Sequence, residues 1–408
     1  MEEPEGFLFH KARDLFADWR WRLNNLYWIT DKDGRKVPFR MNSAQEKLFD
    51  EMHYLNLILK ARQRGFTTFI QIFLLDVCLF NSNIRAGTIA HTLPDAQAIF
   101  RDKIKFPYDN LPEGLRAAIP RIADSASELL LANNSSVRVG TSLRSGTLNY
   151  LHVSEYGKLC AKYPEKAREV RTGALNTVQA GQIVFIESTA EGQEGHYFEL
   201  CESARAKARA KTPLTALDFK FHFHPWWADP DYALDPKDVT IPAEYVRYFE
   251  KTAAVGIHLS AAQKAWYVKK AEVQKGDMLR EYPSTADEAF EASIEGAYYA
   301  EQMSQADLAG RIATFPAIEK VPVDPDKPSG TTRIVPVNTA WDIGYGDYTS
   351  IWFFQENGRS VRAIDYYETS GEGAEDIVRA ALPELIPNER EFTEAFAATG
   401  RKSPYVYA

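Results

Sequence analysis

The sequence predicts an α/β protein in which a helix-covered parallel sheet is followed by a second domain rich in strands. Short apolar runs alternate with helical stretches before about residue 305, which is typical of parallel strands buried under helices on both faces. A proline-rich segment follows, and beyond it apolar and polar residues alternate as they do in β-hairpins. A chain of 408 residues is also too long for one ordinary hydrophobic core.

The first domain begins with helical segments that lead into a buried strand. Apolar and aromatic residues recur at helical spacing over residues 8–28, and a second helical segment is predicted over 42–52. The apolar run 55–59 predicts a buried strand, which passes through a basic turn into a long apolar helix over 67–79. Further strands are predicted at 85–90, 136–140, 150–153 and 183–187.

Two changes in composition divide the rest of the chain. Residues 316–330 carry four prolines in fifteen residues, as a linker does. Residues 332–367 then alternate like hairpin strands, and Asn357-Gly358 between two apolar runs is a strong two-residue turn signal. We therefore expect a first domain over 1–305 with a smaller subdomain from about residue 200, a linker over 306–331 and a second domain over 332–408.

The composition excludes several classes of protein. With 45% hydrophobic and 25% charged residues, the chain is neither collagen-like nor intrinsically disordered. Cys78, Cys160 and Cys201 lie far apart, as buried thiols in a reducing compartment do, and fit neither a disulfide framework nor a zinc knuckle. The apolar stretch 69–80 is too short to span a bilayer, and the first residues do not form a signal peptide. Because the net charge is −8, contact with nucleic acid would need a local basic groove.

A candidate phosphate-binding loop, KARQRGFTT, occupies residues 60–68 between the strand and the long helix. Backbone amides at a helix N-terminus, with Gly65 for close approach, suit the phosphates of a nucleotide. Thr67 is placed to offer its hydroxyl to Mg²⁺, although Phe66 stands where a Walker A loop has lysine. Three cations precede the glycine and could replace that lysine: Lys60, Arg62 and Arg64. The alternative is an ordinary strand-to-helix turn with solvated basic residues.

A candidate Walker B strand covers residues 151–153 and ends in Ser154-Glu155. Strands of this kind end in two acids, of which the first holds Mg²⁺ and the second activates the attacking water. Glu155 occupies the second position and is the predicted general base, while Ser154 replaces the usual aspartate. We therefore expect Mg²⁺ to rest mainly on Thr67 and the phosphates. A glutamate that merely ends a core strand is the alternative.

These motifs together resemble the large subunits of bacteriophage terminases, the ATP-driven motors that package viral DNA. KARQRGFTT resembles the deviant Walker A loop of that family, in which several branches move the essential cation to the front of the loop. The resemblance implies that Lys60 or Arg62 binds phosphate, without deciding between them. It also implies a nucleotide-binding role for the remaining loop residues, which are Gln63, Arg64, Gly65, Thr67 and Thr68. PFRMNSAQEKLF resembles the adenine-recognising segment, so that Gln45 would bind the base.

The resemblance extends to two further motifs. Arg144 stands where these motors carry an arginine finger, acting either in its own subunit or on a neighbour. STAEG, residues 188–192, resembles the motif that couples hydrolysis to movement, in which Ser188 and Thr189 would sense the γ-phosphate. The alternatives are a solvated arginine and a helix N-cap. The similarity continues through FHFHPWWADPDY and EYPSTADEAF.

Two other patterns are expected to be structural. His222 and His224 flank Phe223 at the spacing of one strand face, but without a third ligand nearby they do not indicate zinc. Four alternating cations between residues 205 and 211 indicate a solvated helix face, with contact to the DNA backbone as the alternative: Arg205, Lys207, Arg209 and Lys211.

The second domain resembles the RNase H-like nuclease that follows the motor in terminases. Asp342, at the end of a predicted strand, matches the first carboxylate of the two-metal site, which uses Mg²⁺ or Mn²⁺. Asp347 and Asp365 are candidates to assist it. The stretch after Asp342 is shorter than the roughly 100–150 residues of a complete domain, so we expect an incomplete nuclease and inefficient DNA cutting by this chain.

The resemblance therefore implies a terminase large subunit that binds ATP and Mg²⁺, translocates double-stranded DNA into a procapsid and cuts concatemeric DNA. Its implied partners are DNA, a small terminase subunit and the portal protein, with a homo-oligomeric ring as the working form and no membrane. The implied location is the cytoplasm of the infected bacterium and not the mature virion.

Two other functions remain open. A helicase-like translocase would need motifs of a second motor lobe, which the sequence before the linker does not show. A degenerate ATPase that serves as a DNA-binding or assembly module is suggested by the substituted positions Phe66 and Ser154.

Overall fold

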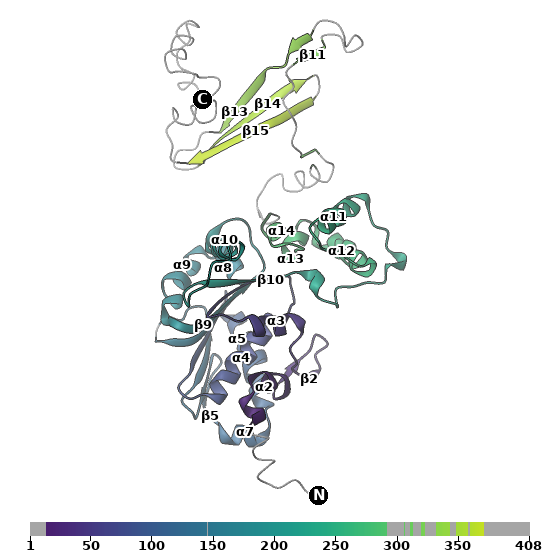
Figure 1. Cartoon of the computed structure of the whole chain (residues 1–408). Helices are drawn as coiled ribbons and strands as arrows, with labels where there is room; N and C mark the ends of the chain where they lie inside the picture. Colours follow the sequence, from purple (N-terminus) through teal and green to yellow (C-terminus); the bar gives the residue numbers. More distant parts are fainter. Residues whose placement is uncertain are drawn as a thin grey trace. The chain divides into compact units, whose positions relative to one another are not determined.

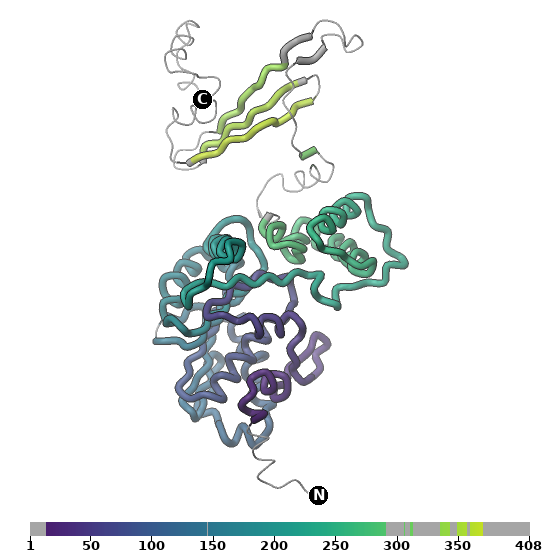
Figure 2. The backbone as a smooth tube through the Cα atoms, viewed as in Figure 1, coloured from purple at the N-terminus to yellow at the C-terminus, as the bar shows by residue number. Residues whose placement is uncertain are grey.

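The computed structural model describes residues 14–144, 146–291, 306, 311–312, 320–322, 332–342, 348–357 and 360–370. The chain divides into two units, Met1–Leu308 and Ala309–Ala408, each of which is described by itself. Figure 1 shows the elements of both units, and Figure 2 follows the same backbone as a tube.

The N-terminal segment of the first unit forms short elements that pack beside the main sheet. They are α2 (Trp19–Asn25), the antiparallel strands β1 (Trp28–Thr30) and β2 (Lys36–Pro38), and α3 (Ser43–Glu51). The helix predicted over residues 8–28 ends at Asn25, because two asparagines, which favour helix poorly, close α2 before β1 begins. The helix predicted over 42–52 is confirmed, and a capping box between Asn42 and Gln45 fixes its start.

An eight-stranded sheet forms the centre of the first unit. Its order is β10-β3-β9-β8-β4-β7-β6-β5, and every pair from β10 to β7 is parallel, whereas β7, β6 and β5 pair antiparallel. The predicted parallel sheet is therefore confirmed. The antiparallel edge was not predicted, because β5 exposes all four of its residues and lacks an apolar run. The strands are β3 (Leu55–Lys60), β4 (Arg85–Ile89), β5 (Arg121–Asp124), β6 (Glu128–Leu131), β7 (Ser136–Gly140), β8 (Leu148–Ser154), β9 (Val178–Ser188) and β10 (Phe219–His224).

Helices cover both faces of this sheet (Figure 1). On one face α4 (Phe66–Phe80) crosses β4, β7, β8 and β9, while α8 (Tyr156–Lys162) and α10 (Gly195–Arg209) lie against the strands from the other face. The remaining helices are α5 (Leu93–Phe100), a π-helical segment Arg101–Lys105, α6 (Phe106–Asp109), α7 (Glu113–Ala118) and α9 (Pro164–Thr172). Short 3₁₀ turns occur at Ala174–Thr177, Trp226–Ala228, Pro236–Asp238 and Lys275–Asp277.

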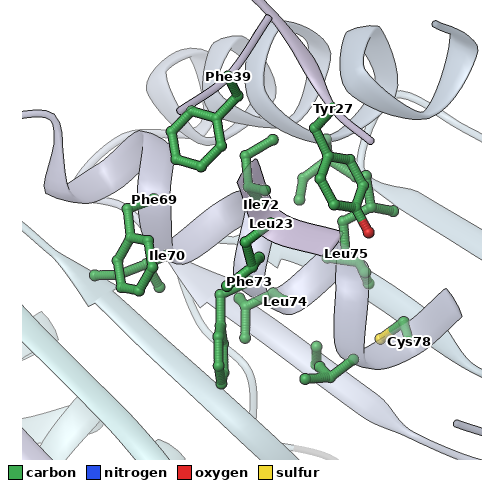
Figure 3. Packing of buried hydrophobic residues seen from close by; sticks show 14 of the residues in the cluster. Leu23, Tyr27, Phe39, Phe69, Ile70, Ile72, Phe73, Leu74, Leu75 and Cys78 are labelled. Atoms are coloured by element: carbon green, nitrogen blue, oxygen red, sulfur yellow. The ribbon is translucent and has the colours of Figure 1, made fainter. Parts of the chain in front are cut away.

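The long helix α4 is buried on nearly all sides. Figure 3 shows Phe69, Phe73 and Leu75 of this helix in one buried cluster with Leu23, Tyr27 and Phe39 of the N-terminal segment. Asp76 lies in the middle of this helix and is fully buried, where it accepts hydrogen bonds from Arg22 and from the Tyr27 hydroxyl. Burial raises the pKa of Asp76, and the Arg22 guanidinium opposes that rise. The ion pair therefore ties α2 to the helix that follows the candidate phosphate loop.

A subdomain rich in aromatic residues follows the sheet. It comprises α11 (Ala243–Ala254), α12 (Ala261–Gln274), α13 (Met278–Glu281) and α14 (Ala286–Glu291). Trp226, Tyr267 and Tyr282 belong to its core. The subdomain expected from about residue 200 starts later, because α10 and β10 still pack in or on the central sheet.

The second unit contains two small antiparallel sheets. The strands β11 (Lys320–Pro322) and β12 (Thr332–Ile334) pair with each other, and β13 (Val337–Asp342), β14 (Tyr348–Asn357) and β15 (Ser360–Ser370) form a meander. Asn357 pairs with Ser360, so the predicted hairpin is confirmed. Asp347 lies outside the described residues. Across the described part of the chain, no helix has the length and apolar character needed to cross a membrane.

Candidate functional site

The candidate phosphate loop joins the end of β3 to the start of α4, as the sequence predicts. Gly65 has φ 75°, a left-handed conformation that favours glycine. A Cβ atom at Gly65 would also come within 2.6 Å of Gln45 Nε2. Gln45 donates from Nε2 to the Gly65 carbonyl over 2.8 Å, so α3 holds the loop in place.

Lys60 is the loop cation that points into the centre of the site. Its Nζ lies 3.0 Å from Glu155 Oε1 and 3.1 Å from Glu187 Oε2, and its side chain is 7% exposed. Burial alone would lower the pKa of Lys60, but the two carboxylates raise it above its ordinary value. Lys60 is therefore a buried cation held by two acids.

The other two loop cations are engaged elsewhere. Arg62 is 55% exposed and pairs with Glu281 of α13, whereas the buried Arg64 pairs with Asp229. Gln63 lies between them, exposed and with φ 55°. Of the two candidates for the phosphate cation, Lys60 faces the acids and Arg62 faces α13.

Glu155 follows β8 directly and adopts an unusual backbone conformation. Its φ and ψ of 52° and 48° are left-handed, which costs a non-glycine residue on the order of 1–3 kcal/mol. The turn sets the carboxylate beside Lys60 while leaving the side chain 32% exposed. Strain of this kind is found at sites where a side chain must be aimed, and here it aims the predicted general base.

Glu187, at the end of β9, is a site residue that the sequence analysis missed. It is fully buried and accepts hydrogen bonds from Thr67 Oγ1 over 2.8 Å and from Ser154 Oγ over 2.9 Å. Burial alone would raise the pKa of Glu187, but the charge of Lys60 and hydrogen bonds that include the one from Thr67 hold it well below its ordinary value. The strand 183–187 was predicted, and the acid at its end was the available signal.

A buried polar network continues beneath Glu187. His152 Nδ1 lies 2.7 Å from Gln71 Nε2, and His152 Nε2 lies 3.4 Å from Glu187 Oε1. Because the Gln71 amide donates to Nδ1, the ring proton belongs on Nε2, which faces the carboxylate. Gln71 also bonds Thr88 over 3.0 Å. The network therefore supports the acid from β8, β4 and the interior of α4.

The STAEG segment contacts the turn that carries Glu155. Ser188 Oγ accepts a hydrogen bond from the Gly157 amide over 3.0 Å. A Cβ atom at Gly157 would come within 2.8 Å of the Thr189 carbonyl, so the two segments touch through their backbones. Ser188 and Thr189 are both buried.

Two remaining site candidates occupy different surroundings. Arg144 is 59% exposed, and its Nε lies 2.6 Å from Glu169 Oε1 on α9, so it is not part of the contacts around Lys60. Thr68 lies in the first turn of α4 and accepts a hydrogen bond from Lys103 over 2.7 Å. Lys103 belongs to the π-helical segment, and burial lowers its pKa. No motif in the sequence indicates the contact of Lys103 with Thr68.

A cavity of about 630 Å³ opens beside the loop, between α3 and the end of β10. Its walls include Lys47, Arg64, His222, His224 and Trp227. Gln45 does not line it, because its amide is already bonded to the Gly65 carbonyl and to the Asn42 amide. Burial lowers the pKa of His222 and of His224 to about 3, and His222 Nε2 lies 3.1 Å from Asn56 Oδ1.

The cations predicted to form a solvated helix face are mostly paired within the chain. Arg205 is buried and pairs with Glu202 and Asp287, and Lys207 pairs with Asp218. Arg209 Nη2 lies 3.6 Å from Asp287. Arg205 therefore belongs to the packing of α10 and not to a solvated face.

In the second unit, the strand register separates Asp342 from Asp365. Asp342 pairs with Ser350, which in turn pairs with Glu368. Asp365 pairs with Phe353, three positions along β14 from Ser350. Because paired residues share a face and side chains alternate, Asp365 faces away from Asp342. The two candidate metal ligands therefore do not converge. The acid that shares a face with Asp342, across Ser350 on the neighbouring strand, is Glu368.

Across the described residues of both units, no group of three or more His, Cys, Asp and Glu side chains is arranged to hold a metal ion. A nucleotide-dependent Mg²⁺ site does not need such a group, since phosphates and water provide most of its ligands. Thr67 and Glu187 supply the oxygen donors that Mg²⁺ prefers, so the first unit fits that kind of site.

Comparison with protein-family models and with curated proteins gives no match. Among solved structures, the chain is similar to the large terminase ATPase domain of Thermus phage P74-26, with 14% identity and a TM-score of 0.37 over 60% of this chain and 93% of that one. It is also similar to a thermophilic bacteriophage large terminase in complex with ATP-gamma-S, with 11% identity and a TM-score of 0.37 over 86% of this chain and 75% of that one. A third match is the Phi-28 gp11 DNA packaging motor, with 10% identity and a TM-score of 0.29 over 80% of this chain and 78% of that one.

Proposed function

We propose that this chain is an ATP-hydrolysing DNA-packaging motor of the terminase large-subunit type. The observation that carries the proposal is the position of Lys60 between Glu155 and Glu187, the second of which also accepts a hydrogen bond from Thr67. Lys60 ends β3, Thr67 starts α4 and Glu155 follows β8. A cation, a hydroxyl and an acid on adjoining elements are the groups that bind a nucleoside triphosphate and activate water.

The loop and the first turn of α4 bind the phosphates of ATP. The amides of that turn, which have no partner within the helix, face the anion, and Gly65 lets the backbone approach it. Lys60 then exchanges its contact with the acids for a contact with phosphate. Mg²⁺, when bound, neutralises charge on the β- and γ-phosphates. Thr67 would hold it through its hydroxyl.

Glu155 acts as the general base. Its carboxylate is partly exposed, so a water molecule can reach it once Lys60 has turned to the phosphates. Ser188 accepts a hydrogen bond from the Gly157 amide, two residues after Glu155, and so transmits changes at this turn to the STAEG segment. Arg144 is exposed and is proposed to stabilise the γ-phosphate of a neighbouring subunit in the working ring.

The cavity beside the loop is the proposed site of the base. Trp227 offers a ring for stacking, and Arg64 and Lys47 offer donors. Gln45 remains a candidate for adenine recognition only if its amide leaves the Gly65 carbonyl. In the packaging setting, the further partners are double-stranded DNA, a small terminase subunit and a portal protein, in the cytoplasm of an infected bacterium.

We propose for the second unit a metal-dependent nuclease role centred on Asp342, which ends β13 beside Ser350 in the row of Glu368. The test is nicking of plasmid DNA by the full chain with Mg²⁺ or Mn²⁺. Cleavage that Asp342→Ala abolishes and Asp365→Ala spares would support this assignment, whereas equal cleavage by the wild type and Asp342→Ala would remove Asp342 from the site.

The ATPase proposal is tested by ATP turnover of the full chain, with Lys60→Ala beside Arg62→Ala. Both changes remove one cation from the same loop, but only Lys60 contacts Glu155. We expect Lys60→Ala to abolish turnover and Arg62→Ala to retain most of it. A wild-type chain with no ATP turnover would favour the rival function, a degenerate ATPase that serves as an assembly module.

A further inference from the structure

We infer that Glu187, on β9, supplies the carboxylate of the Mg²⁺ site that Ser154 does not supply from β8. This inference rests on the proposed ATPase function and assigns the metal ligand of the same site. It names a residue outside the Ser154-Glu155 pair, and it follows from the strand register and from three contacts.

The register places the two positions side by side. Ser154 and Glu187 are direct partners on the parallel neighbours β8 and β9. Their side chains point to the same face, and the Ser154 hydroxyl donates to Glu187 Oε1 over 2.9 Å. Adjacent strands lie about 4.8 Å apart, which is within the reach of a glutamate side chain. An acid on β9 can therefore occupy the space that an aspartate at position 154 would fill.

Glu187 also contacts the helix that follows the phosphate loop. Thr67 Oγ1, the predicted hydroxyl ligand, donates to Glu187 Oε1 over 2.8 Å. A cation coordinated near Thr67 would therefore lie beside this carboxylate and bind it either directly or through one water molecule. Glu155, by contrast, contacts Lys60 and makes no hydrogen bond to Thr67 among the described residues.

One buried oxygen of Glu187 depends on Lys60 alone. Glu187 Oε2 is inaccessible to solvent, and its one partner among the described residues is the Lys60 ammonium group, 3.1 Å away. If Lys60 turns to the phosphates, a fully buried carboxylate loses that counter-ion next to further negative charge. An uncompensated buried charge is strongly destabilising. A divalent cation between Glu187 and the phosphates would compensate the charge of the carboxylate and of the phosphates together.

The competing explanation is that Glu187 serves only as a counter-ion for Lys60. Glu155 provides a matched control, because it lies equally close to Lys60, at 3.0 Å against 3.1 Å. Glu155→Gln and Glu187→Gln thus remove the same charge from the same lysine. Only Glu187→Gln removes an acid that contacts Thr67.

The experiment measures metal binding and not turnover. The full chain and its variants are titrated with a fluorescent ADP analogue with and without Mg²⁺, and with Mn²⁺ in the presence of ADP by electron paramagnetic resonance. We expect Mg²⁺ to raise the affinity for ADP in the wild type and in Glu155→Gln. Glu187→Gln should lose about 10–100-fold in Mn²⁺ affinity, and Ser154→Asp added to it should restore most of that loss.

A further variant guards against misfolding. Glu187→Asp keeps a charge beside Lys60 and withdraws the carboxylate by one methylene, so it should fold and still bind Mn²⁺ several-fold more weakly. Unchanged Mn²⁺ affinity in Glu187→Gln, or in Glu187→Asp where the first variant does not fold, overturns this inference and leaves the ATPase proposal standing. A wild-type chain that binds no ADP with or without Mg²⁺ overturns the proposed function and the inference with it.

Discussion

Lys60 neutralises two acids of the candidate site at once. Its ammonium group lies between Glu155 and Glu187, so both carboxylates have a counter-ion. Under the proposed function, binding of a triphosphate would exchange one set of buried ion pairs for another, which keeps the net electrostatic cost of binding small. The exchange would also free Glu155 to act as a base.

The first prediction concerns Glu155→Gln. Hydrolysis of ATP should fall by about 10²–10⁴-fold, because a positioned general base is lost, while nucleotide affinity stays within a few-fold of the wild type. Turnover and binding of a fluorescent nucleotide are measured on the same preparations. Hydrolysis within a few-fold of the wild-type rate would show that another group activates the water.

The second prediction concerns pH and the buried pair His222 and His224. Burial lowers the pKa of each to about 3, whereas an unfolded histidine titrates near 6.5, so the unfolded chain binds more protons between these values. Stability is therefore unaffected by this pair above about pH 6.5 and falls below it, by up to about 2 kcal/mol for each histidine at pH 5.

Urea unfolding at pH 7 and pH 5 tests this expectation. The double variant with His222→Gln and His224→Gln should lose less stability on acidification than the wild type does, and His258→Gln, at an exposed position, controls for replacing a histidine as such. The same acid sensitivity in the double variant and the wild type would mean that other groups cause it.

At the scale of single residues, the sequence predicts site residues that belong to one short motif. Lys60, Gly65 and Thr67 belong to one loop and its helix, so their chemistry can be read from a short segment. Glu187 and Lys103 could not be found in this way. Their contacts with Thr67 and Thr68 depend on strand order and on where the π-helical segment packs, which a single sequence does not specify.

Among the elements, α13 contacts the phosphate loop and the STAEG segment through consecutive residues. Arg280 Nη1 lies 2.8 Å from Glu191 Oε2, and Glu281 pairs with Arg62. Arg280 also lies 3.2 Å from its neighbour Glu281. The aromatic subdomain is thus tied to both ends of the reaction site by a chain of largely buried ion pairs.

The third prediction is that Arg280→Ala loosens this connection. Hydrogen exchange of backbone amides should increase in residues 188–192 and in α13, because a buried partner of Glu191 is lost, while the strands of the sheet keep their protection. Lys269→Ala removes an exposed cation from the same subdomain and should change little. Equal protection in Arg280→Ala and the wild type would contradict a coupling role for this contact.

The fourth prediction uses two glycines as a pair. Gly157→Ala should destabilise the chain by about 1–3 kcal/mol, because its new methyl group would lie 2.8 Å from the Thr189 carbonyl and 2.9 Å from Ser188 Oγ. Gly114→Ala, in α7, meets no atom within 4 Å and should be neutral or slightly stabilising. Urea unfolding compares the two. A Gly157→Ala chain as stable as the wild type would show that the STAEG segment can shift at no cost.

The strands at 55–59, 85–90, 136–140, 150–153 and 183–187 were predicted, whereas β5 was not, and neither was β6, although it contains three consecutive leucines. The apolar run at 183–187 covers only the buried end of β9. The strand begins at Val178, and its first half is largely exposed and has no apolar run. The edge strand β5 is exposed at every position and has no periodic signal. The subdomain expected from about residue 200 begins only after β10, because α10 packs on the sheet and β10 is one of its strands. The alternating cations of α10 do not reveal this packing, although Arg205 is buried.

At the level of the whole molecule, the two units contain different chemistry. The contacts among Lys60, Thr67, Glu155 and Glu187 all lie within the first unit. Asp342 lies in the second unit, in a sheet with its own small core. The side chains proposed for nucleotide binding and the aspartate proposed for nuclease chemistry therefore belong to different units.

The fifth prediction follows from this separation. A fragment ending at residue 308 should bind the fluorescent ADP analogue with an affinity within a few-fold of the full chain, and Asp342→Ala should leave ATP turnover unchanged. Circular dichroism confirms that the fragment is folded before binding is compared. Loss of nucleotide binding by a folded fragment would show that the second unit completes the site.

The fold class could be predicted from the alternation of strands and helices, but the order of the strands could not. The chain places β9 between β3 and β8, so the strand that ends in Glu187 enters the sheet beside the phosphate loop. Nothing in the local sequence of residues 178–188 specifies these neighbours. For the same reason, the opposite facing of Asp342 and Asp365 follows from register and not from their spacing in the chain.

The register of Ser154 with Glu187 has a consequence for how such sites diverge. Two neighbouring parallel strands offer equivalent places for one acid, so a lineage that carries an acid in both places can lose either one by a single substitution and keep a working site. A motif search along one strand would classify the protein that lost the acid from that strand as degenerate. A search that also compares register partners on the neighbouring strand would recognise both proteins.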